Sequence, residues 1–286
     1  MAARRMRLDA ELVRRKMCDS RERARDLIDS GRVIVNGVAA TKPATQVEPT
    51  TSIALTASDE PDWASRGAHK LVGALDTFAG VTVDGARCLD AGASTGGFTD
   101  VLLRRGAASV IAVDIGHDQL AANLATDPRV TVRDGTSVRD LDPALIGGMV
   151  DLLVADLSFI SLRTVIAPLA SVVRPGGDLL VMVKPQFEVG RAALPRTGVV
   201  TDPAQHRRAV IEVARSAAEA GLEALGAGVS PLAGQDGNRE FFLHLRPSGH
   251  AVTLTDRACD MIESVVTGRP APGPHRHITE GEDGAG

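Results

Sequence analysis

A glycine-rich turn in the first half of the chain has the residue types of a small-molecule binding loop. The stretch CLDAGASTGGFTDVLL (residues 88–103) runs from apolar residues to Asp90, crosses Gly92, Gly96 and Gly97, and continues as an amphipathic helical pattern. Glycines at such a turn allow a ligand to approach the backbone closely. The spacing is not G-x-G-x-x-G and no Lys-Ser/Thr pair follows, so neither a dinucleotide fingerprint nor a phosphate-binding loop is matched. An aspartate before the glycines favours a ligand that carries positive charge.

Two further aspartates extend this pattern. Asp114 ends the next apolar segment, where a carboxylate can accept hydrogen bonds from ribose hydroxyls, and Asp134 follows the third, near where an adenine would lie. An acid, a glycine turn and a second acid after the next strand form the layout expected for S-adenosylmethionine, and a nicotinamide cofactor is the alternative. The predicted cofactor-binding residues are Asp90, Gly92, Ala93, Ser94, Gly96, Gly97, Phe98, Asp114 and Asp134.

Two more strand ends carry charged residues. Asp156 follows the apolar run VDLLVA, and Lys184 follows DLLVMV just before a proline. Both are expected to face the same cleft as the glycine loop. A structural ion pair at the sheet edge is the alternative and would stabilise little in solvent. We favour a function because catalytic residues concentrate at such ends and loops, and a lysine that loses its proton near neutral pH can act as a base.

The elements that must position these residues alternate along the chain. Short Val/Leu-rich strands separated by helices indicate a mostly parallel sheet covered on both faces, and therefore an α/β, Rossmann-like fold. Strands are predicted at residues 87–91, 110–114, 130–132, 150–156, 179–184 and 239–246, and helices at 68–78, 99–105 and 206–220.

The N-terminal region, residues 1–60, is predicted to form a small α+β domain. Asp9 and Ser20 are expected to cap two short helices, and Asn36-Gly37 predicts a hairpin turn. Residues 1–50 hold 11 Lys+Arg against 7 Asp+Glu, a net charge of +4, so the rest of the chain carries −8 to give the total of −4. A basic N-terminal region attached to an acidic remainder of the chain indicates a polyanion-binding module. The predicted contact residues are Arg14, Arg15, Lys16, Arg21, Arg23 and Arg25.

Composition sets the remaining boundaries. Residues 61–67 are predicted to be a linker in which Trp63, the only tryptophan, packs between the domains. Residues 68–266 are predicted to form the large domain. The Pro- and Gly-rich residues 267–286 are predicted to be a disordered tail. No apolar run of about 18 residues predicts a membrane span, and no signal-peptide pattern precedes Asp9. Three scattered cysteines predict neither a disulfide framework nor a metal site. We therefore expect a cytoplasmic protein without metal.

Several strings together carry a family resemblance. WASRGAHKLVGAL, CLDAGASTGGFTDVLL, VDLLVADLSFISL, VKPQFEVG and GNREFFLHL resemble the TlyA family of haemolysin A-like rRNA methyltransferases, from about residue 7 to residue 246, and SRERARDLIDSGRVIVNG resembles an alpha-L (S4-type) RNA-binding domain. The resemblance implies an S4-type domain joined to an FtsJ-type, class I methyltransferase domain. It also implies methyl transfer from S-adenosylmethionine to the ribose 2′-hydroxyl of cytidines in small- or large-subunit rRNA, with ribosomal subunits as partners.

The same resemblance implies a catalytic tetrad of Lys70, Asp156, Lys184 and Glu240, and a role in cofactor binding for the segment around Trp63. We expect Lys184 to activate the hydroxyl, Lys70 and Asp156 to tune it, and Glu240 to orient the lysines or the ribose. In-line proximity should supply much of the acceleration. A membrane-active haemolysin and a non-catalytic RNA-binding protein are the alternatives. The sequence identifies neither the target nucleotide nor the oligomeric state.

Overall fold

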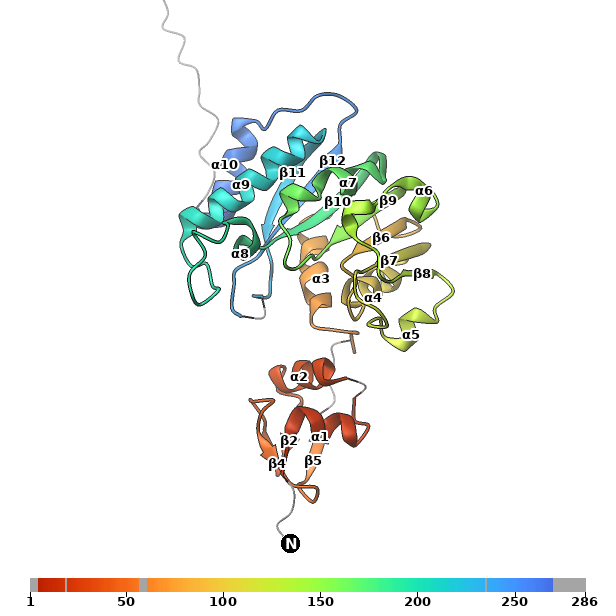
Figure 1. Ribbon diagram of the computed structural model, residues 1–286, viewed down its shortest axis with the longest axis vertical. Helices are drawn as coiled ribbons and strands as arrows, with labels where there is room; N and C mark the ends of the chain where they lie inside the picture. The colour runs from red at the N-terminus through yellow and green to blue at the C-terminus, as the bar shows by residue number, and fades with distance from the viewer. Residues whose placement is uncertain (1–4, 19, 57–60, 235, 270–286) are drawn as a thin grey trace, which may run out of the picture.

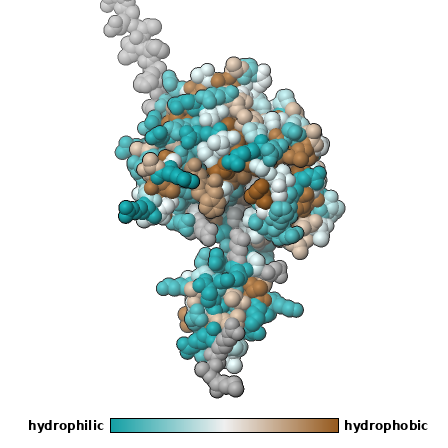
Figure 2. Space-filling view, viewed as in Figure 1, coloured by the Kyte–Doolittle hydropathy of each residue, from teal (hydrophilic) through white to brown (hydrophobic). Residues whose placement is uncertain are grey.

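The structure is a computed structural model that describes residues 5–18, 20–56, 61–234 and 236–269. The chain folds into a small lobe built from its N-terminal part and a larger α/β lobe (Figure 1). Figure 2 shows hydrophilic side chains over much of the small lobe, with some apolar ones among them. The predicted order, a small α+β domain before a Rossmann-like domain, is therefore confirmed.

The small lobe packs two short helices on two small sheets. Strand β2 (Val33–Val35) lies between β3 (Val38–Ala39) and β5 (Ile53–Leu55), all antiparallel, while β1 (Met6–Arg7) pairs with β4 (Gln46–Val47). Asn36 and Gly37 adopt positive φ angles of 49° and 83°, as the predicted hairpin turn requires. The core beneath α1 (Leu8–Arg14) and α2 (Arg21–Asp29) contains Leu8, Leu12, Ala24, Leu27, Ile28, Val33, Ala40 and Val47.

The two predicted helix caps differ in outcome. Ser20 caps α2, because its side chain accepts a hydrogen bond from the backbone N–H of Arg23. The prediction that Asp9 caps α1 is wrong: Arg7 is the N-cap residue, and Asp9 lies in the first turn with its side chain buried. The physical reason is that Arg7 and Arg21 each hold the Asp9 carboxylate at 2.9 Å, which makes it the centre of an ion-pair cluster.

The large lobe is built on one seven-stranded sheet. Its order is β11-β12-β10-β9-β6-β7-β8; the five strands β10, β9, β6, β7 and β8 run parallel to one another, and β12 is antiparallel to both β10 and β11. The strands are β6 (Arg87–Ala91), β7 (Ser109–Val113), β8 (Val130–Arg133), β9 (Val150–Ala155), β10 (Val173–Val183), β11 (Leu222–Val229) and β12 (Phe241–Pro247).

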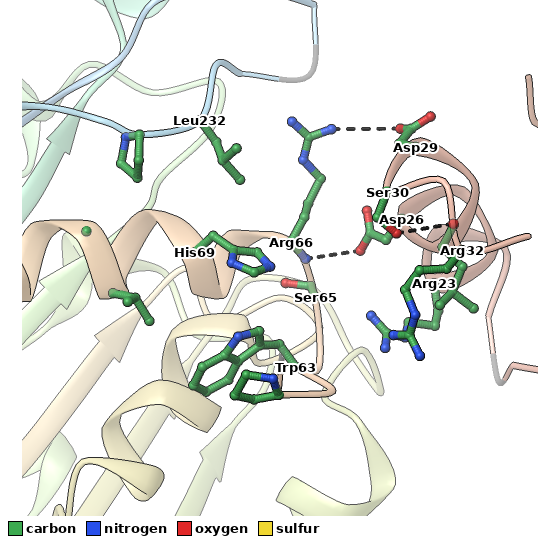
Figure 3. Close-up of a pocket in the computed structure, with 15 residues that line it drawn as sticks. Arg23, Asp26, Asp29, Ser30, Arg32, Trp63, Ser65, Arg66, His69 and Leu232 are labelled. Atoms are coloured by element: carbon green, nitrogen blue, oxygen red, sulfur yellow. Dashed lines mark hydrogen bonds and ion pairs between the residues drawn. The ribbon is translucent and has the colours of Figure 1, made fainter. Parts of the chain in front are cut away.

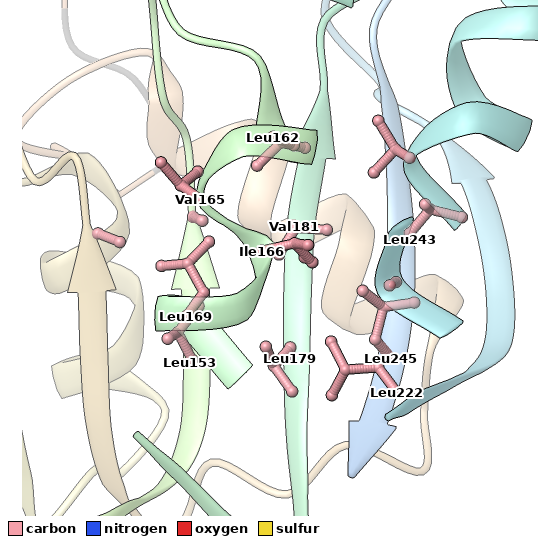
Figure 4. Close-up of a cluster of buried hydrophobic side chains, with 14 of the residues drawn as sticks. Leu153, Leu162, Val165, Ile166, Leu169, Leu179, Val181, Leu222, Leu243 and Leu245 are labelled. Carbon is pink, nitrogen blue, oxygen red and sulfur yellow. The ribbon is translucent and has the colours of Figure 1, made fainter. Parts of the chain in front are cut away.

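Helices cover both faces of this sheet because successive strand residues point to opposite sides. On β9, Leu152 belongs to the core shared with α3 and α4. Leu153 belongs to the core on the other face, which includes residues of α7, α9 and α10 (Figure 4). The helices are α3 (Gly67–Thr77), α4 (Gly97–Arg104), α5 (Ala122–Ala125), α6 (Pro143–Ile146), α7 (Ile166–Ser171), α8 (Pro185–Glu188), α9 (Pro203–Glu219) and α10 (Asp256–Thr267).

The C-terminal strands are where the structure adds most to the sequence analysis. The strand predicted at 239–246 corresponds to β12, but β11 was not predicted, and the two antiparallel strands extend the parallel sheet at one edge. Thr267, placed in the predicted tail, still belongs to α10, which Gly268 closes in a left-handed conformation. The tail from residue 270 onward lies outside the described residues.

Residues 61–66 contact both lobes. Arg23 and Arg32 of the small lobe pair with the side chain of Asp62, whose carbonyl accepts a hydrogen bond from Arg104 of α4 at 3.0 Å. Asp26 of α2 in turn accepts a hydrogen bond from the backbone N–H of Arg66 at 3.1 Å. The division predicted at residues 61–67 remains a proposal, and these contacts support it.

Candidate functional site

The glycine loop joins β6 to α4 at the carboxyl edge of the sheet. Gly92 and Gly96 have φ angles of +85° and +95°, which disfavour any side chain. A Cβ on Gly92 would lie 2.7 Å from the carbonyl oxygen of Asp156, and one on Gly97 would lie 2.3 Å from the Ser65 hydroxyl oxygen. The loop therefore packs directly against a predicted catalytic residue and against the interdomain segment.

Asp90 lies beneath this loop without a cationic partner among the described residues. One carboxylate oxygen accepts a hydrogen bond from the Thr99 hydroxyl at 2.7 Å, while the other, also buried, contacts no donor in that part of the chain. Burial, followed by the nearby charge of Asp156, raises the pKa of Asp90 to about 7 despite the bond from Thr99. A buried, half-satisfied carboxylate next to a glycine loop fits a ligand that carries positive charge.

The acids after β7 and β8 border the same loop. Asp114 accepts hydrogen bonds from the backbone N–H of Ser94 at 2.8 Å and of Gly116 at 2.7 Å, and each carboxylate oxygen retains capacity for a ribose hydroxyl. Asp134 instead accepts from the backbone N–H of Asp118 at 2.8 Å, so it orders the turn beside the loop. These contacts are consistent with the predicted ribose and adenine sides of the site.

Two apolar residues of this region differ in their exposure to solvent. The side chain of Phe98 is buried in the core and stacks on Phe242 with 6.3 Å between ring centres, so a cofactor contact by Phe98 is confined to its backbone. Ile115, which the sequence analysis did not single out, follows Asp114 directly and is 68% exposed. An exposed isoleucine beside the carboxylate that is predicted to bind ribose is a candidate surface for an adenine ring.

The structure brings the four predicted catalytic residues together as a chain of ion pairs. Asp156 is shared between two lysines: one oxygen lies 2.6 Å from Lys184 Nζ, and the other lies 3.9 Å from Lys70 Nζ. Lys70 Nζ also binds Glu240 Oε2 at 2.7 Å. The order is thus Lys184, Asp156, Lys70, Glu240, so that lysines and carboxylates alternate, and the side chains of Lys70, Lys184 and Glu240 are buried.

Separate elements hold these four side chains. Lys70 lies in the first turns of α3, Asp156 and Lys184 follow the carboxyl ends of β9 and β10, and Glu240 directly precedes β12. The loop before β12 is fixed by Asn238, whose side chain accepts a hydrogen bond from the backbone N–H of Val200 at 2.9 Å and donates one to the carbonyl of Gly198 at 3.0 Å. Because Asn238 is buried, this bridge fixes the position of Glu240.

The loop after Asp156 contains two residues that sequence reasoning missed. Ser158 accepts a hydrogen bond from Lys184 Nζ at 2.9 Å. Phe159, next to it, is 92% exposed and has a φ angle of +62°, a conformation that costs energy for a bulky side chain. Glu188 holds the loop in place by accepting hydrogen bonds from the Ser161 hydroxyl at 2.6 Å and from the Leu162 N–H at 2.7 Å. Backbone strain of this kind is found at functional sites.

The predicted RNA-binding side chains lie on the small lobe, and the structure divides them. Arg14, Arg21 and Arg25 are about half exposed and pair with the buried carboxylates Glu11 and Asp9. Arg15 is more enclosed: it pairs with Glu11 and donates to the carbonyl of Thr51 at 2.9 Å, and Arg23 binds Asp62. The exposed members, with the exposed Lys16, form the surface best placed to meet a polyanion.

Comparison with known proteins agrees with this geometry. Residues 63–247 match the FtsJ-like methyltransferase family, and residues 6–53 match the S4 domain. The chain is 52% identical, over 98% of its length and 99% of the relative, to the 16S/23S rRNA (cytidine-2′-O)-methyltransferase TlyA of Mycobacterium tuberculosis. It is 34% identical to hemolysin A of Brachyspira hyodysenteriae, over 84% of this chain and 99% of that protein. A solved structure from Streptococcus thermophilus, provisionally described as a hemolysin, covers 93% of this chain and 96% of its own at 33% identity, with a TM-score of 0.74.

The fold and the family matches define a class I methyltransferase that carries an S4 domain at its N-terminal side. The chain belongs to the TlyA family of FtsJ-like methyltransferases. Within the described residues, no helix is long and apolar enough to cross a membrane.

Proposed function

We propose that the protein transfers a methyl group from S-adenosylmethionine to the ribose 2′-hydroxyl of cytidines in ribosomal RNA of the small subunit, the large subunit or both. The observation that carries this proposal is the ion-pair chain from Lys184 to Glu240, which lies directly against the glycine loop through Asp156 and Gly92. The relatives named as rRNA cytidine-2′-O-methyltransferases support the substrate. Intact ribosomal subunits as partners, and action in the cytoplasm where ribosomes lie, follow from that substrate.

The residues present fit the cofactor. Asp90 offers a buried oxygen without a partner, Asp114 offers a ribose site, and the glycines leave room that a Cβ would fill. When bound, S-adenosylmethionine supplies an electrophilic methyl group on a positively charged sulfur. The role of this chain is to bind it, to bring the ribose oxygen into line with it and to remove the hydroxyl proton.

Lys184 is the residue proposed to remove that proton. Its amine lies 2.9 Å from a hydroxyl, that of Ser158, so it is within reach of hydroxyl groups, and in its unprotonated form it can accept a hydrogen bond from a ribose hydroxyl. As the oxygen attacks, Lys184 Nζ in its unprotonated form takes up the proton, and the resulting ammonium is stabilised by Asp156 at 2.6 Å. Lys70 and Glu240 hold the other oxygen of Asp156 in place through their own pair.

The RNA is proposed to contact both lobes. Arg14, Lys16, Arg21 and Arg25 supply charge for phosphate contacts that depend steeply on salt. The exposed ring of Phe159, beside the tetrad, is placed to stack on a base next to the target ribose.

The test is transfer of labelled methyl groups from S-adenosylmethionine to purified small and large ribosomal subunits, followed by digestion to nucleosides. We expect 2′-O-methylcytidine with the wild-type protein and with Lys42→Ala, a control at an exposed lysine outside the site, and none above background with Lys184→Ala. Absence of transfer to either subunit by the wild-type protein, together with lysis of erythrocytes, would support the haemolysin alternative.

A further inference from the structure

A cavity lies between the two lobes, outside the methyl-transfer site. Its volume is about 570 Å³, within the range of small-molecule pockets, which favour domain interfaces. It is bounded by α2 of the S4 domain on one side, and by the interdomain segment and α3 on the other (Figure 3). His69, Val72 and Gly73 line it from one face of α3, whereas Lys70 of the same helix is buried and pairs with Asp156 and Glu240 of the tetrad. The proposed methyl transfer makes no use of this cavity.

The walls of the cavity combine a flat aromatic surface with charges of both signs. Trp63 and His69 lie on the side of the methyltransferase domain, and Asp26 and Arg32 lie opposite, on the S4 side (Figure 3). One face of the Trp63 ring is covered by Arg104, whose guanidinium carbon lies 4.7 Å from the ring centre. Leu27, Pro231 and Leu232 complete the apolar part of the lining.

The charged groups retain capacity for a ligand. Arg23 and Arg32 each use part of their guanidinium to bind Asp62, and a guanidinium has five N–H donors. On the acidic side, Asp26 accepts a hydrogen bond from the N–H of Arg66, and burial raises the pKa of Asp26. A buried carboxylate has lost hydrogen bonds to water, so a further donor, such as an exocyclic amine, would stabilise its charged form.

An aromatic ring, amine donors on its edge and an attached anion are the features of a nucleotide. We propose that this cavity binds one unpaired nucleotide of the substrate RNA, with its base against Trp63, an exocyclic amine toward Asp26 and its phosphate toward Arg23 and Arg32. The RNA as source rests on the proposed function. Binding there places the RNA between the S4 domain and α3, the helix that carries Lys70.

The chain contains its own probe for this cavity. Trp63 is the only tryptophan and the chain has no tyrosine, so intrinsic fluorescence reports on this wall alone. We expect saturable quenching when the full-length protein is titrated with a single-stranded RNA oligonucleotide, and little quenching with an RNA duplex of equal length. AMP and CMP should quench only at far higher concentration. Quenching by the free nucleotides at the same concentrations as by the oligonucleotide would overturn RNA as the source.

Two variants test the cavity itself. Ser30→Phe fills it from the exposed end of α2, and Arg32→Gln removes a cation but keeps a polar side chain. Each variant should lose the quenching. Each should also bind single-stranded RNA roughly 10-fold more weakly, as expected when one stacked base is lost, and the anisotropy of labelled RNA measures this affinity. Arg21→Glu, on the outer S4 surface, should weaken affinity but reach the same final quenching. Both cavity variants behaving as wild type would overturn the proposal. If the wild-type protein methylates rRNA but shows no quenching, this proposal alone fails; if it quenches without methylating, the proposed function fails.

Discussion

Buried carboxylates in the two domains have opposite surroundings. In the S4 domain, burial raises the pKa of Asp9, but hydrogen bonds from Arg7 and Arg21 outweigh it and lower that pKa to about 2. Hydrogen bonds from Arg14 and Arg15 likewise lower the pKa of Glu11 to about 2. In the methyltransferase domain, Asp90 is also shielded from solvent and lies deeper in the protein; it meets no cation within the described residues, and burial raises its pKa to about 7.

The difference shows what each carboxylate does. Asp9 and Glu11 hold exposed arginines in fixed positions and so order the cationic surface that is proposed to contact RNA. Asp90 is half-satisfied, and a cationic ligand at the glycine loop would complete its surroundings. Asp156 shares one feature with each group: it pairs with cations, as Asp9 and Glu11 do, and it lies beside the glycine loop, as Asp90 does.

The largest effect is expected where the paired charges face the substrate. Asp156→Asn removes the charge that Lys184 and Lys70 share, so methyl transfer should fall by roughly 10²–10⁴-fold, the range for losing acid–base assistance. Single-turnover rates with saturating cofactor and ribosomal subunits measure this, and calorimetry checks that the cofactor still binds. Near-normal turnover would remove Asp156 from the mechanism.

Replacing the unpaired carboxylate should separate binding from stability. Asp90→Asn should weaken S-adenosylmethionine binding by about 10-fold or more, the scale of one hydrogen bond to a charged group. The same change should stabilise the protein without cofactor at pH 8, because it removes a buried charge without a counterion. Calorimetry and chemical unfolding measure the two effects, and destabilisation at pH 8 would contradict this description of Asp90.

Replacing a carboxylate that is paired with arginines should change the stability of the protein in the opposite direction. Asp9→Asn leaves Arg7 and Arg21 without their shared partner and should destabilise the S4 domain by about 2 kcal/mol. Asp127→Asn is a matched control, since Asp127 pairs with Arg129 near the surface at 2.8 Å, where solvent screens the pair, and should change stability far less. Equal effects of the two substitutions in urea unfolding would show that burial of the pair adds nothing.

The two domains should also differ in their pH dependence. Asp9 and Glu11 have lowered pKa values, so the stability they contribute is present above about pH 4 and is lost as the pH falls through about 2. Asp90 has a raised pKa, so its contribution is favourable at low pH and declines as the pH rises toward about 7. Cofactor affinity should therefore rise with pH up to about 7, and that rise should be absent in Asp90→Asn. A pH-independent affinity in the wild-type protein would contradict the assignment.

The strands of the central sheet were predicted from the pattern of apolar residues, whereas the full tetrad was predicted from the family resemblance. The strands that became β6, β7 and β9 are compact apolar runs that end in an aspartate, so composition alone located them. Strand β11 contains two glycines and lacks such a run, and its antiparallel pairing depends on long-range contacts with β12. That Glu240 meets Lys70 follows from β12 lying beside β10, which chain order does not specify.

Smaller features of the site depend on tertiary contacts. Asp9 has the residue type of a helix cap, but three arginines around it decided its role. The positive φ of Phe159 has no local sequence signal such as glycine or asparagine, and it depends on Glu188, which fixes the following residues from another element.

The most direct test of the central claim is the position of the methyl group on the RNA. The segment after β9, Asp156 to Phe159, lacks the prolines with which base-nitrogen methyltransferases commonly grip a flipped base, and Cys88 is buried in β6 with its pKa raised to about 12 by that burial. What lies beside the glycine loop is a lysine–carboxylate set suited to a hydroxyl. Ribosomal RNA methylated by the protein should therefore resist alkaline cleavage at the 3′ phosphodiester of the modified nucleotide, because its 2′-oxygen is blocked. Normal cleavage there, with the added mass on the nucleobase, would contradict the account.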